Sequence, residues 1–276
     1  MIKLSILGAD GFMGQLITKL ALQDKEFQII HAYTIPSSPN LGKDLGVLSG
    51  YNLINVPIVD TAQFETDCKS NPPDVIIDFT VAKGTEVNGI IAAKLGLPIV
   101  IGTTGLSNEF NSKFDDFCKA AKGSAVISSN MAIGMNVYFK IAAEIAKELK
   151  GWDIEIIEAH HHRKRDSPSG TALTIAKNIA EAIEKNLDEI AKFGRPNGPS
   201  PRKIGAEEIG IHAIRAGDIV GDHTVLYAGP GERIELVHRA HSRECFASGA
   251  VKAAKFLAQK PKDGTIYYMQ DVLGLK

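Results

Sequence analysis

Cysteine is scarce in this chain of 276 residues, which has only Cys68, Cys118 and Cys245. Because they are odd in number and widely spaced, with no C-x-x-C pair, they argue against a disulfide framework or structural zinc site and favour a reducing compartment. An apolar run of 18 residues is also lacking, which argues against a membrane span. The opening MIKLSILGADG predicts a strand and turn and not a signal peptide. We therefore expect a cytoplasmic protein.

An excess of charge is absent too. The 31 basic and 32 acidic residues give a formal net charge of −1, so nothing draws the whole chain to nucleic acid or to an anionic membrane. Hydrophobic residues at 44 % and charged residues at 23 % are typical of a soluble globular protein. The length suits one large domain or two ordinary ones.

The N-terminal segment predicts a nucleotide-binding turn. A strand at residues 2–7 is followed by GADGFMG and then by a helical pattern. Gly8 permits a tight turn, Gly11 lets the backbone approach a pyrophosphate, and Gly14 lets the helix pack on the strand. Asp10 stands where the commoner G-x-G-x-x-G has its middle glycine. The order strand, turn, helix favours dinucleotide binding over an ordinary glycine-rich turn.

The pattern of short apolar strands and helices then repeats through the first half. Because several strands are apolar throughout, we expect a Rossmann-type α/β domain with a parallel sheet covered on both faces. Ligands of such sheets lie outside the carboxyl ends of the strands. The predicted strands are 27–33, 74–80, 98–105 (a strand and its turn) and 124–130, with helices at 84–96 and 107–122.

The second half differs, and predicts an α+β domain with a largely antiparallel or mixed sheet. We place the dinucleotide-binding domain at 1–130, completed by about 243–276, and the second domain at 131–242. The last helix, 244–260, is expected to pack on the first domain. The other predicted elements are helices at 131–151 and 170–187, strands at 152–162, 207–217, 223–229 and 233–242, and a surface loop at 193–203.

The stretch EAHHHRKRDSPSGTAL, residues 158–173, admits several readings. On a strand, His160 and His162 would point one way and His161 the other, which disfavours a shared metal. The basic run is short and lacks the interleaved aromatics of a nucleic-acid site. A solvated loop remains an alternative. A histidine pair, a lysine and a helix start rich in serine and glycine favour a pocket for a small carboxylate, with proton donors near neutral pH.

At this point the chain resembles the 4-hydroxy-tetrahydrodipicolinate reductase (dihydrodipicolinate reductase) family, whose signature is H-H-x-x-K-x-D-x-P-S-G-T. GADGFMG, DFT, IGTTG, SSNMAIGMNV and IRAGDIVGDHTVLYAGPGERIELVHRA match the family in order, so the resemblance covers the whole chain. It implies a Rossmann domain, a second domain that binds substrate and forms a homotetramer through its sheet, and NAD(P)H-dependent reduction of a cyclic dicarboxylate in lysine and diaminopimelate biosynthesis. From the strand geometry above and the lack of an H-E-x-x-H or paired-cysteine pattern, we expect no metal site.

The resemblance also implies site residues. His160 would donate or accept a proton and Lys164 would donate one. The substrate's carboxylates would be held by His161, Ser169, Gly170 and Thr171. The expected cofactor contacts are Gly8, Ala9, Asp10, Gly11, Phe12, Met13, Thr34, Gly102, Thr103, Thr104, Ser128, Ser129, Asn130 and Met131.

Cofactor choice is less determined. At the end of the second strand, where the family commonly has an acidic residue followed by a basic one, the chain reads Thr34-Ile35. No acidic residue there can bind a ribose 2′-hydroxyl, and no arginine there can bind a 2′-phosphate. We therefore expect the protein to use both NADH and NADPH, with NADPH equal or somewhat better. Ser37, Ser38 and Lys43 are candidate contacts. Two rival functions stay open: another two-domain dehydrogenase, such as an aspartate or sugar dehydrogenase, and a non-catalytic nucleotide sensor.

Overall fold

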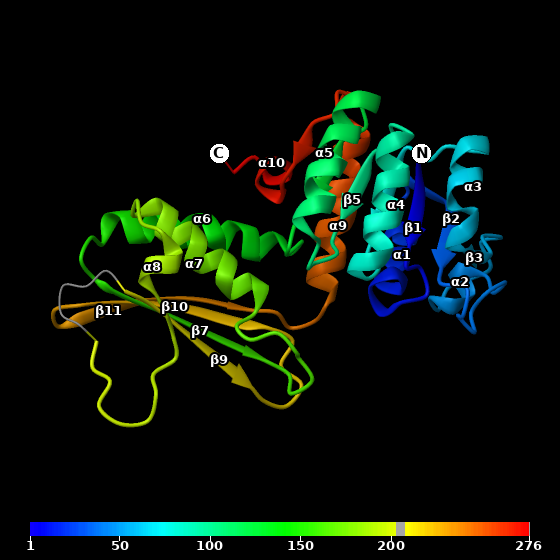
Figure 1. Ribbon diagram of the computed structural model, residues 1–276. Helices are drawn as coiled ribbons and strands as arrows, with labels where there is room; N and C mark the ends of the chain where they lie inside the picture. Colours follow the sequence, from blue (N-terminus) through cyan, green and yellow to red (C-terminus); the bar gives the residue numbers. More distant parts are fainter. Residues whose placement is uncertain (203–207, 276) are drawn as a thin grey trace. The chain divides into compact units, whose positions relative to one another are not determined.

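The computed structural model describes residues 1–202 and 208–275. Contacts within it divide the chain into two units (Figure 1). Unit 1 comprises Met1–Ile133 and Glu244–Lys276, and unit 2 comprises Gly134–Arg243. The N-terminal and C-terminal segments of the chain therefore belong to the same unit.

Unit 1 contains a seven-stranded sheet in which every strand pair is parallel. The strand order is β12-β6-β5-β4-β1-β2-β3, so the sheet grows in one direction from β1 to β3 and in the other from β4 to β12. The strands are β1 (Ile2–Leu7), β2 (Phe27–Thr34), β3 (Ile58–Asp60), β4 (Val75–Asp78), β5 (Ile99–Ile101), β6 (Ala125–Ile127) and β12 (Ile266–Tyr267).

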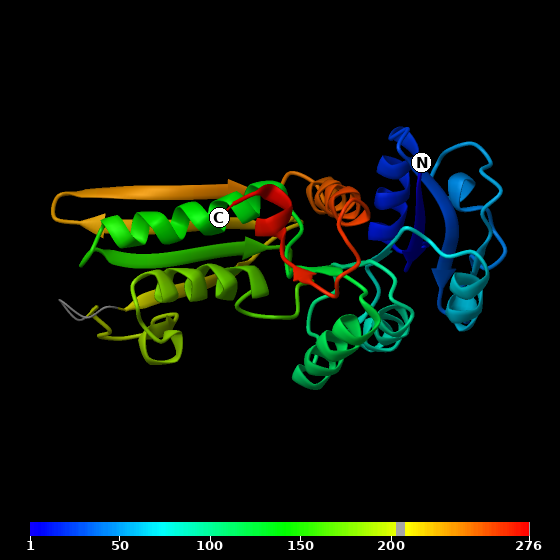
Figure 2. The ribbon, with the colours of Figure 1, turned by 90° about the horizontal axis from the view of Figure 1, so that it is seen from above.

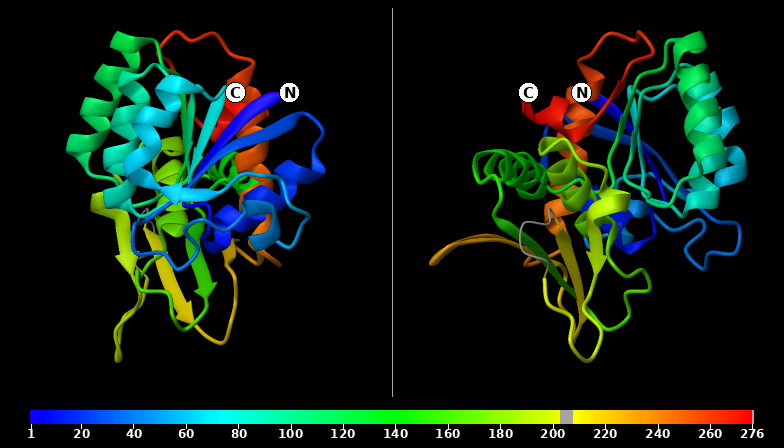
Figure 3. Two further views of the ribbon diagram at one scale, coloured as in Figure 1. Left: turned by 90° about the vertical axis from the view of Figure 1, so that its right-hand side faces the viewer. Right: turned by 60° about the vertical axis from the view of Figure 1, so that its left-hand side comes forward.

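Helices cover both faces of this sheet, as the apolar strands predict (Figure 3). Alternate residues along one strand serve different cores: Ile6 packs with α1 (Phe12–Gln23) and α9 (Glu244–Ala258), whereas Leu7 packs with the helices of the other face. Those are α3 (Phe64–Ser70), α4 (Ala82–Lys94) and α5 (Asn108–Ala121). The last long helix, α9, packs against α1 and the strands of unit 1.

Unit 2 contains a five-stranded mixed sheet with the order β11-β10-β7-β9-β8. The hairpin of β10 and β11 is antiparallel, and β10 also runs antiparallel to β7, while β7, β9 and β8 are parallel (Figure 2). The strands are β7 (Asp153–His160), β8 (Ala191–Phe193), β9 (Ile209–Arg215), β10 (Asp222–Gly229) and β11 (Glu232–Arg239).

The long helices of unit 2 lie on one face of its sheet, and Figure 1 shows no helix among the unit's described residues on the other face. They are α6 (Ile133–Glu148, whose first residue belongs to unit 1) and α7 (Gly170–Ala182). Tyr138 of α6 donates to the carbonyl of Leu236 at 2.9 Å, and Tyr227 of β10 donates to that of Ala142 at 2.6 Å. β7 alternates half-buried and buried residues, so one set of side chains faces the helices and the other faces away.

Both predicted fold classes are confirmed, but the sequence analysis did not predict the short elements. They are β3, β8, β12, the 3₁₀ turn at Thr61–Gln63, α2 (Leu45–Leu48), α3, α8 (Leu187–Ile190) and α10 (Met269–Leu273). The strand expected over 152–162 ends at His160, because the next two N–H groups bond to loop carbonyls, of Ile219 and Gly217. Of the strand expected at 207–217, residue 207 lies outside the described residues, as does residue 203 of the expected loop.

Candidate functional site

The turn between β1 and α1 lies where the strand order of unit 1 reverses, the usual ligand position of an open α/β sheet. Gly8 has a φ of 77°, a left-handed conformation that favours glycine. Its N–H and that of Ala9 both donate to the carbonyl of Tyr33 at 3.0 Å. A Cβ at Gly14 would lie 2.2 Å from the Gly8 carbonyl oxygen. The turn is therefore closely packed in the way the glycine spacing predicts.

The start of α1 suits an anion. Its N-cap, Gly11, makes no side-chain cap hydrogen bond, and the first turn holds no acidic residue. Gly11 and Phe12 are exposed, and Met13 is half-buried. Backbone N–H groups and the helix dipole favour negative charge at such a helix start. The residues present thus fit the pyrophosphate of a dinucleotide.

The segment after β5 lies on the same rim of the sheet. A Cβ at Gly102 would lie 2.2 Å from the Phe79 ring, so only glycine fits there without moving that ring. Thr103 is buried, and its hydroxyl donates to the carbonyl of Thr80 at 3.2 Å. Thr104 is exposed. Since the Thr103 side chain is already bonded, a cofactor could contact this residue only through its backbone.

In the segment after β6, polar side chains are again bonded within the protein. The Asn130 side-chain oxygen accepts from the N–H of Ala132 at 2.9 Å, and the Ser128 hydroxyl donates to the Asn130 carbonyl at 2.8 Å. Met131 is buried in the core of unit 1, whereas Ser129 is exposed. These bonds fix the segment's conformation and leave Ser129 as its most accessible predicted residue.

Glu158 is the centre of a second site, in unit 2. It is fully buried, and its carboxylate lies 2.6 Å from Nδ1 of His160, 2.8 Å from two guanidinium nitrogens of Arg215 and 3.0 Å from the N–H of Ser169. Burial raises the pKa of this carboxyl, but the hydrogen bonds outweigh burial and hold the pKa at about 2. Glu158 is therefore ionised, and it joins the ends of β7 and β9 to the start of α7.

His160 lies at the end of β7 and is 8 % exposed. Because ionised Glu158 has no proton to donate, Nδ1 of His160 carries the hydrogen and Nε2 is left for proton exchange. The His223 ring meets the His160 ring edge to face, with centroids 5.2 Å apart. Burial, reinforced by neighbouring His160, lowers the pKa of His223 to about 3. His223 is therefore neutral at pH 7 and does not serve as the acid.

Lys164 lies in the loop between β7 and α7. Its ammonium pairs with Asp166 at 2.9 Å, and its side chain is 21 % exposed. The Asp166 carbonyl accepts from Arg215 at 2.7 Å, which connects the loop to the Glu158 cluster. Burial lowers the pKa of His161, in the same loop. The structure thus links His160 and Lys164 through one network of charged groups.

The start of α7 completes the second site. Ser169 caps the helix by accepting from the N–H of Ala172 at 3.1 Å, and its hydroxyl lies 3.3 Å from Nε2 of His223. A Cβ at Gly170 would meet nothing within 4 Å, so the backbone faces open space there. Thr171 is half-buried. A carboxylate would meet N–H groups and the positive helix end at this position.

The three histidines do not converge. His162 is exposed and its Nδ1 lies 2.8 Å from the Gly217 carbonyl, whereas His160 is buried at the strand end. Within residues 1–202 and 208–275, no group of three or more histidines, cysteines and acids is arranged to hold a metal ion.

Sequence reasoning missed three members of the second site: Glu158, Arg215 and His223. Glu158 could have been found, because it precedes His160 by two residues and so shares its face of the strand. Arg215 and His223 come from β9 and β10 and reach the site only through the sheet register. No local sequence pattern predicts that these two residues belong to the site.

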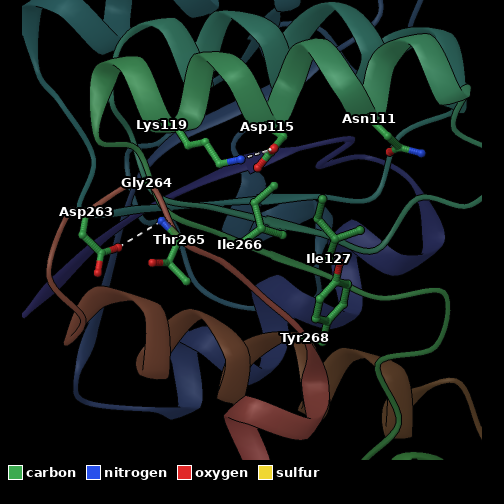
Figure 4. Close-up of a pocket in the computed structure, with 9 residues that line it drawn as sticks. All are labelled: Asn111, Asp115, Lys119, Ile127, Asp263, Gly264, Thr265, Ile266 and Tyr268. Atoms are coloured by element: carbon green, nitrogen blue, oxygen red, sulfur yellow. Dashed lines mark hydrogen bonds and ion pairs between the residues drawn. The ribbon is translucent and has the colours of Figure 1, made fainter.

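Unit 1 also has a hollow of about 760 Å³ beside β12 (Figure 4). Its charged side chains are already engaged: Lys119 pairs with Asp115 at 2.5 Å, and Asp263 accepts from the N–H of Thr265 at 3.0 Å. The hollow is lined by Asn111, Asp115, Lys119, Ile127, Asp263, Gly264, Thr265, Ile266 and Tyr268. It contains none of the residues predicted for the cofactor or the substrate.

No helix within the described part of the chain is long and apolar enough to cross a membrane.

Comparison with known proteins identifies the family. A sequence profile for the N-terminus of dihydrodipicolinate reductase matches residues 2–131, and one for its C-terminus matches residues 134–273. The 4-hydroxy-tetrahydrodipicolinate reductase of Methanosarcina barkeri is 48 % identical, with all of both chains covered. That of Methanocaldococcus jannaschii is 45 % identical over all of this chain and 98 % of its own.

A solved structure agrees on the fold. The dipicolinate-bound dihydrodipicolinate reductase from Paenisporosarcina sp. TG-14 has a TM-score of 0.75 at 24 % identity, with 98 % of each chain covered. The predicted family and its reductase activity are confirmed, and the Rossmann-type domain implies a nicotinamide cofactor. The chain belongs to the dihydrodipicolinate reductase family of oxidoreductases, which acts in lysine and diaminopimelate biosynthesis.

Proposed function

We propose that this chain reduces 4-hydroxy-tetrahydrodipicolinate to tetrahydrodipicolinate, with His160 and Lys164 of unit 2 as the proton-handling groups. Family membership supports the reaction. The observation that supports the residue roles is the buried Glu158 carboxylate, which orients His160 at 2.6 Å beside an open helix start. A pocket for a small dicarboxylate needs such fixed donors and such an anion-binding helix end.

The reaction balances as follows. Loss of water from the substrate gives a conjugated cyclic imine, hydride adds at C4, and the electron-rich intermediate takes up one proton. The nicotinamide supplies the hydride when bound. His160 exchanges a proton at Nε2, and Lys164 supplies a second cationic donor that also favours the dicarboxylate. Backbone N–H groups at Gly170 and Thr171, with His161 and Ser169, hold the carboxylates.

Unit 1 binds the cofactor in this proposal. The Gly8–Met13 turn and the start of α1 hold the pyrophosphate. The backbone at Gly102–Thr104 and at Ser128–Met131, together with Thr34, completes the contacts. NADH and NADPH are both accepted.

Two further features complete the proposal. A homotetramer forms through the uncovered face of the five-stranded sheet, where Ile214 and Val237 are 47 % and 44 % exposed; light scattering measures its mass. A cytoplasmic location is supported by the buried thiols of Cys68 and Cys118, which form no disulfide bond.

The experiment that tests the function follows absorbance at the reduced nicotinamide band, with substrate generated in situ by the preceding synthase. We expect cofactor consumption that depends on the chain and on synthase product, and that metal chelators leave unchanged. Absence of consumption would contradict the proposal. Dinucleotide binding without consumption would favour the sensor, and turnover of aspartate or a sugar in place of the imine would favour another dehydrogenase.

A further inference from the structure

An acidic side chain lies at the carboxyl end of β2, although neither the last residue of β2 nor the residue after it is acidic. Dinucleotide-binding sheets use an acidic side chain at this place to bind the adenosine ribose 2′-hydroxyl. β2 ends at Thr34, and Ile35 follows. The structure brings an acid from the β1–α1 turn: Oδ1 of Asp10 accepts from the Thr34 hydroxyl at 2.5 Å.

Two more side chains hold Asp10 in place. The Ser38 hydroxyl donates to Oδ2 at 2.5 Å, and the Asn40 amide lies 3.4 Å from the same oxygen. Burial alone would raise the pKa of Asp10, but these bonds outweigh burial and keep the pKa below its ordinary value. Asp10 is therefore ionised at neutral pH. Since a carboxylate offers about four acceptor positions, these three side-chain donors leave room for a ribose hydroxyl.

We propose that Asp10 is the residue that selects between the two cofactors, and that it favours NADH. Its carboxylate accepts a hydrogen bond from the ribose diol of NADH and repels the 2′-phosphate of NADPH. The inference rests on the dinucleotide site proposed for unit 1 and adds the determinant of specificity. It revises the expectation of equal or better use of NADPH, which considered only residues adjacent in sequence to the end of β2.

Lys43 is a positive charge connected to this carboxylate through Asn40. Its ammonium lies 2.8 Å from the side-chain oxygen of Asn40, so the Asn40 amide stands between it and Asp10. Lys43 is also exposed, whereas Asp10 is half-buried. Solvent screens an exposed charge on a flexible stem more than a fixed, half-buried one. The carboxylate therefore dominates the choice between a hydroxyl and a phosphate.

The test is a pair of dissociation constants, for NADH and NADPH, measured by fluorescence titration without substrate. For the unaltered chain we expect NADH to bind roughly tenfold more tightly or better. Asp10→Asn keeps the size of the side chain and removes its charge, so the ratio should approach one, mainly because NADPH binds more tightly. Lys43→Gln is the matched control of opposite sign and should preserve the preference for NADH.

A second readout needs no nicotinamide. AMP should displace NADH better than adenosine 2′,5′-bisphosphate does, and Asp10→Asn should remove this difference. Asp10→Ser serves as a second uncharged variant should Asp10→Asn fail to fold. Equal or tighter NADPH binding by the unaltered chain, or an unchanged ratio in a folded uncharged variant, would overturn the inference. Failure to bind either dinucleotide would overturn the proposed cofactor site itself.

Discussion

Two helix starts in this molecule are both suited to anions, but they are built differently. α1 begins at a glycine turn without a side-chain cap, and α7 begins behind Ser169, a buried cap 3.3 Å from His223. The first can bind a phosphate group through its backbone alone. The second is fixed by Glu158, which also orients His160. The difference between them is that at the second helix start an ionised, buried carboxylate fixes an imidazole ring, which is what the proton-transfer role that we propose for His160 requires.

The largest expected effect is that of substituting Lys164, which should affect catalysis but not cofactor binding. Lys164→Ala should lower kcat by roughly two to four orders of magnitude, because a positioned proton donor is lost. The dissociation constant for the dinucleotide should hardly change, since the proposed cofactor contacts lie in unit 1. Steady-state kinetics and fluorescence titration on one preparation measure both. Arg165→Ala, an exposed base in the same loop, is the control; an equal loss of kcat there would point to general charge.

The next effect concerns the carboxylate that distinguishes the second site. Glu158→Gln should lower kcat roughly a hundredfold. The loss should appear in kcat while the dissociation constant for the dinucleotide stays unchanged, because Glu158 orients His160 and lies outside the proposed cofactor site. Removal of this partner from Arg215 should also lower the free energy of unfolding by about 3 kcal/mol. Urea denaturation, steady-state kinetics and fluorescence titration measure these changes.

Glu155→Gln is the matched control, since Glu155 lies on the same strand and pairs with Arg195, Arg202 and His212. Its substitution should lower stability without the hundredfold loss of kcat. An equal loss of kcat in both variants would remove the special role of Glu158.

Two smaller effects should distinguish the ligands of the two helix starts. Gly170→Val should raise KM for the imine roughly tenfold and leave dinucleotide binding unchanged, because a side chain there fills open space at the start of α7. Gly11→Val should do the reverse, weakening the dinucleotide at α1. Initial-rate kinetics and titration of both variants measure the contrast. If both variants weakened the same ligand, the assignment of one anion to each helix start would be wrong.

The last effect, spread over several pH units, is on stability against acid. The pKa of His223 is about 3 in the folded chain, below its ordinary value of 6.5, so the unfolded chain binds more protons between these values. Stability should therefore be complete above pH 6.5 and fall below it, by up to about 1.4 kcal/mol per pH unit. Glu158, with a folded pKa of about 2 against 4.5, adds a loss below pH 4.5.

His223→Gln should flatten the first part of this decline, between pH 6.5 and 4.5. Urea unfolding at several pH values measures the slope, and His162→Gln, at an exposed histidine, is the control. Equal slopes in the unaltered chain and His223→Gln would show that His223 is not the linked group.

Much of the fold could be predicted because local patterns carry it. Apolar runs such as IKLSIL and the glycine spacing mark β1 and its turn from adjacent residues alone. Short edge elements such as β12, of two residues, carry no periodicity and form only because β6 offers an open edge. Such elements depend on tertiary structure and could not be predicted from local sequence.

The sites divide in the same way. His160 and Lys164 follow from a contiguous signature, and Gly170 from the residues at a helix start. Arg215 reaches Glu158 across 57 residues, and Asp10 reaches Thr34 across 24. Neither contact is visible in a local pattern, because sheet register and the path of a turn determine both.

The central claim is that unit 2 supplies the proton that accompanies hydride addition, and the single-turnover rate of nicotinamide oxidation tests it most directly. Without that proton, hydride addition gives an unstable anion and reverses, so loss of the proton donor slows net oxidation. The measurement uses saturating cofactor and synthase-generated imine, so that product release does not limit the rate. In His160→Gln this rate should fall by roughly two to four orders of magnitude, with the dissociation constant for the cofactor unchanged. The control His162→Gln should retain its rate. A His160→Gln rate close to that of the unaltered chain would contradict the account.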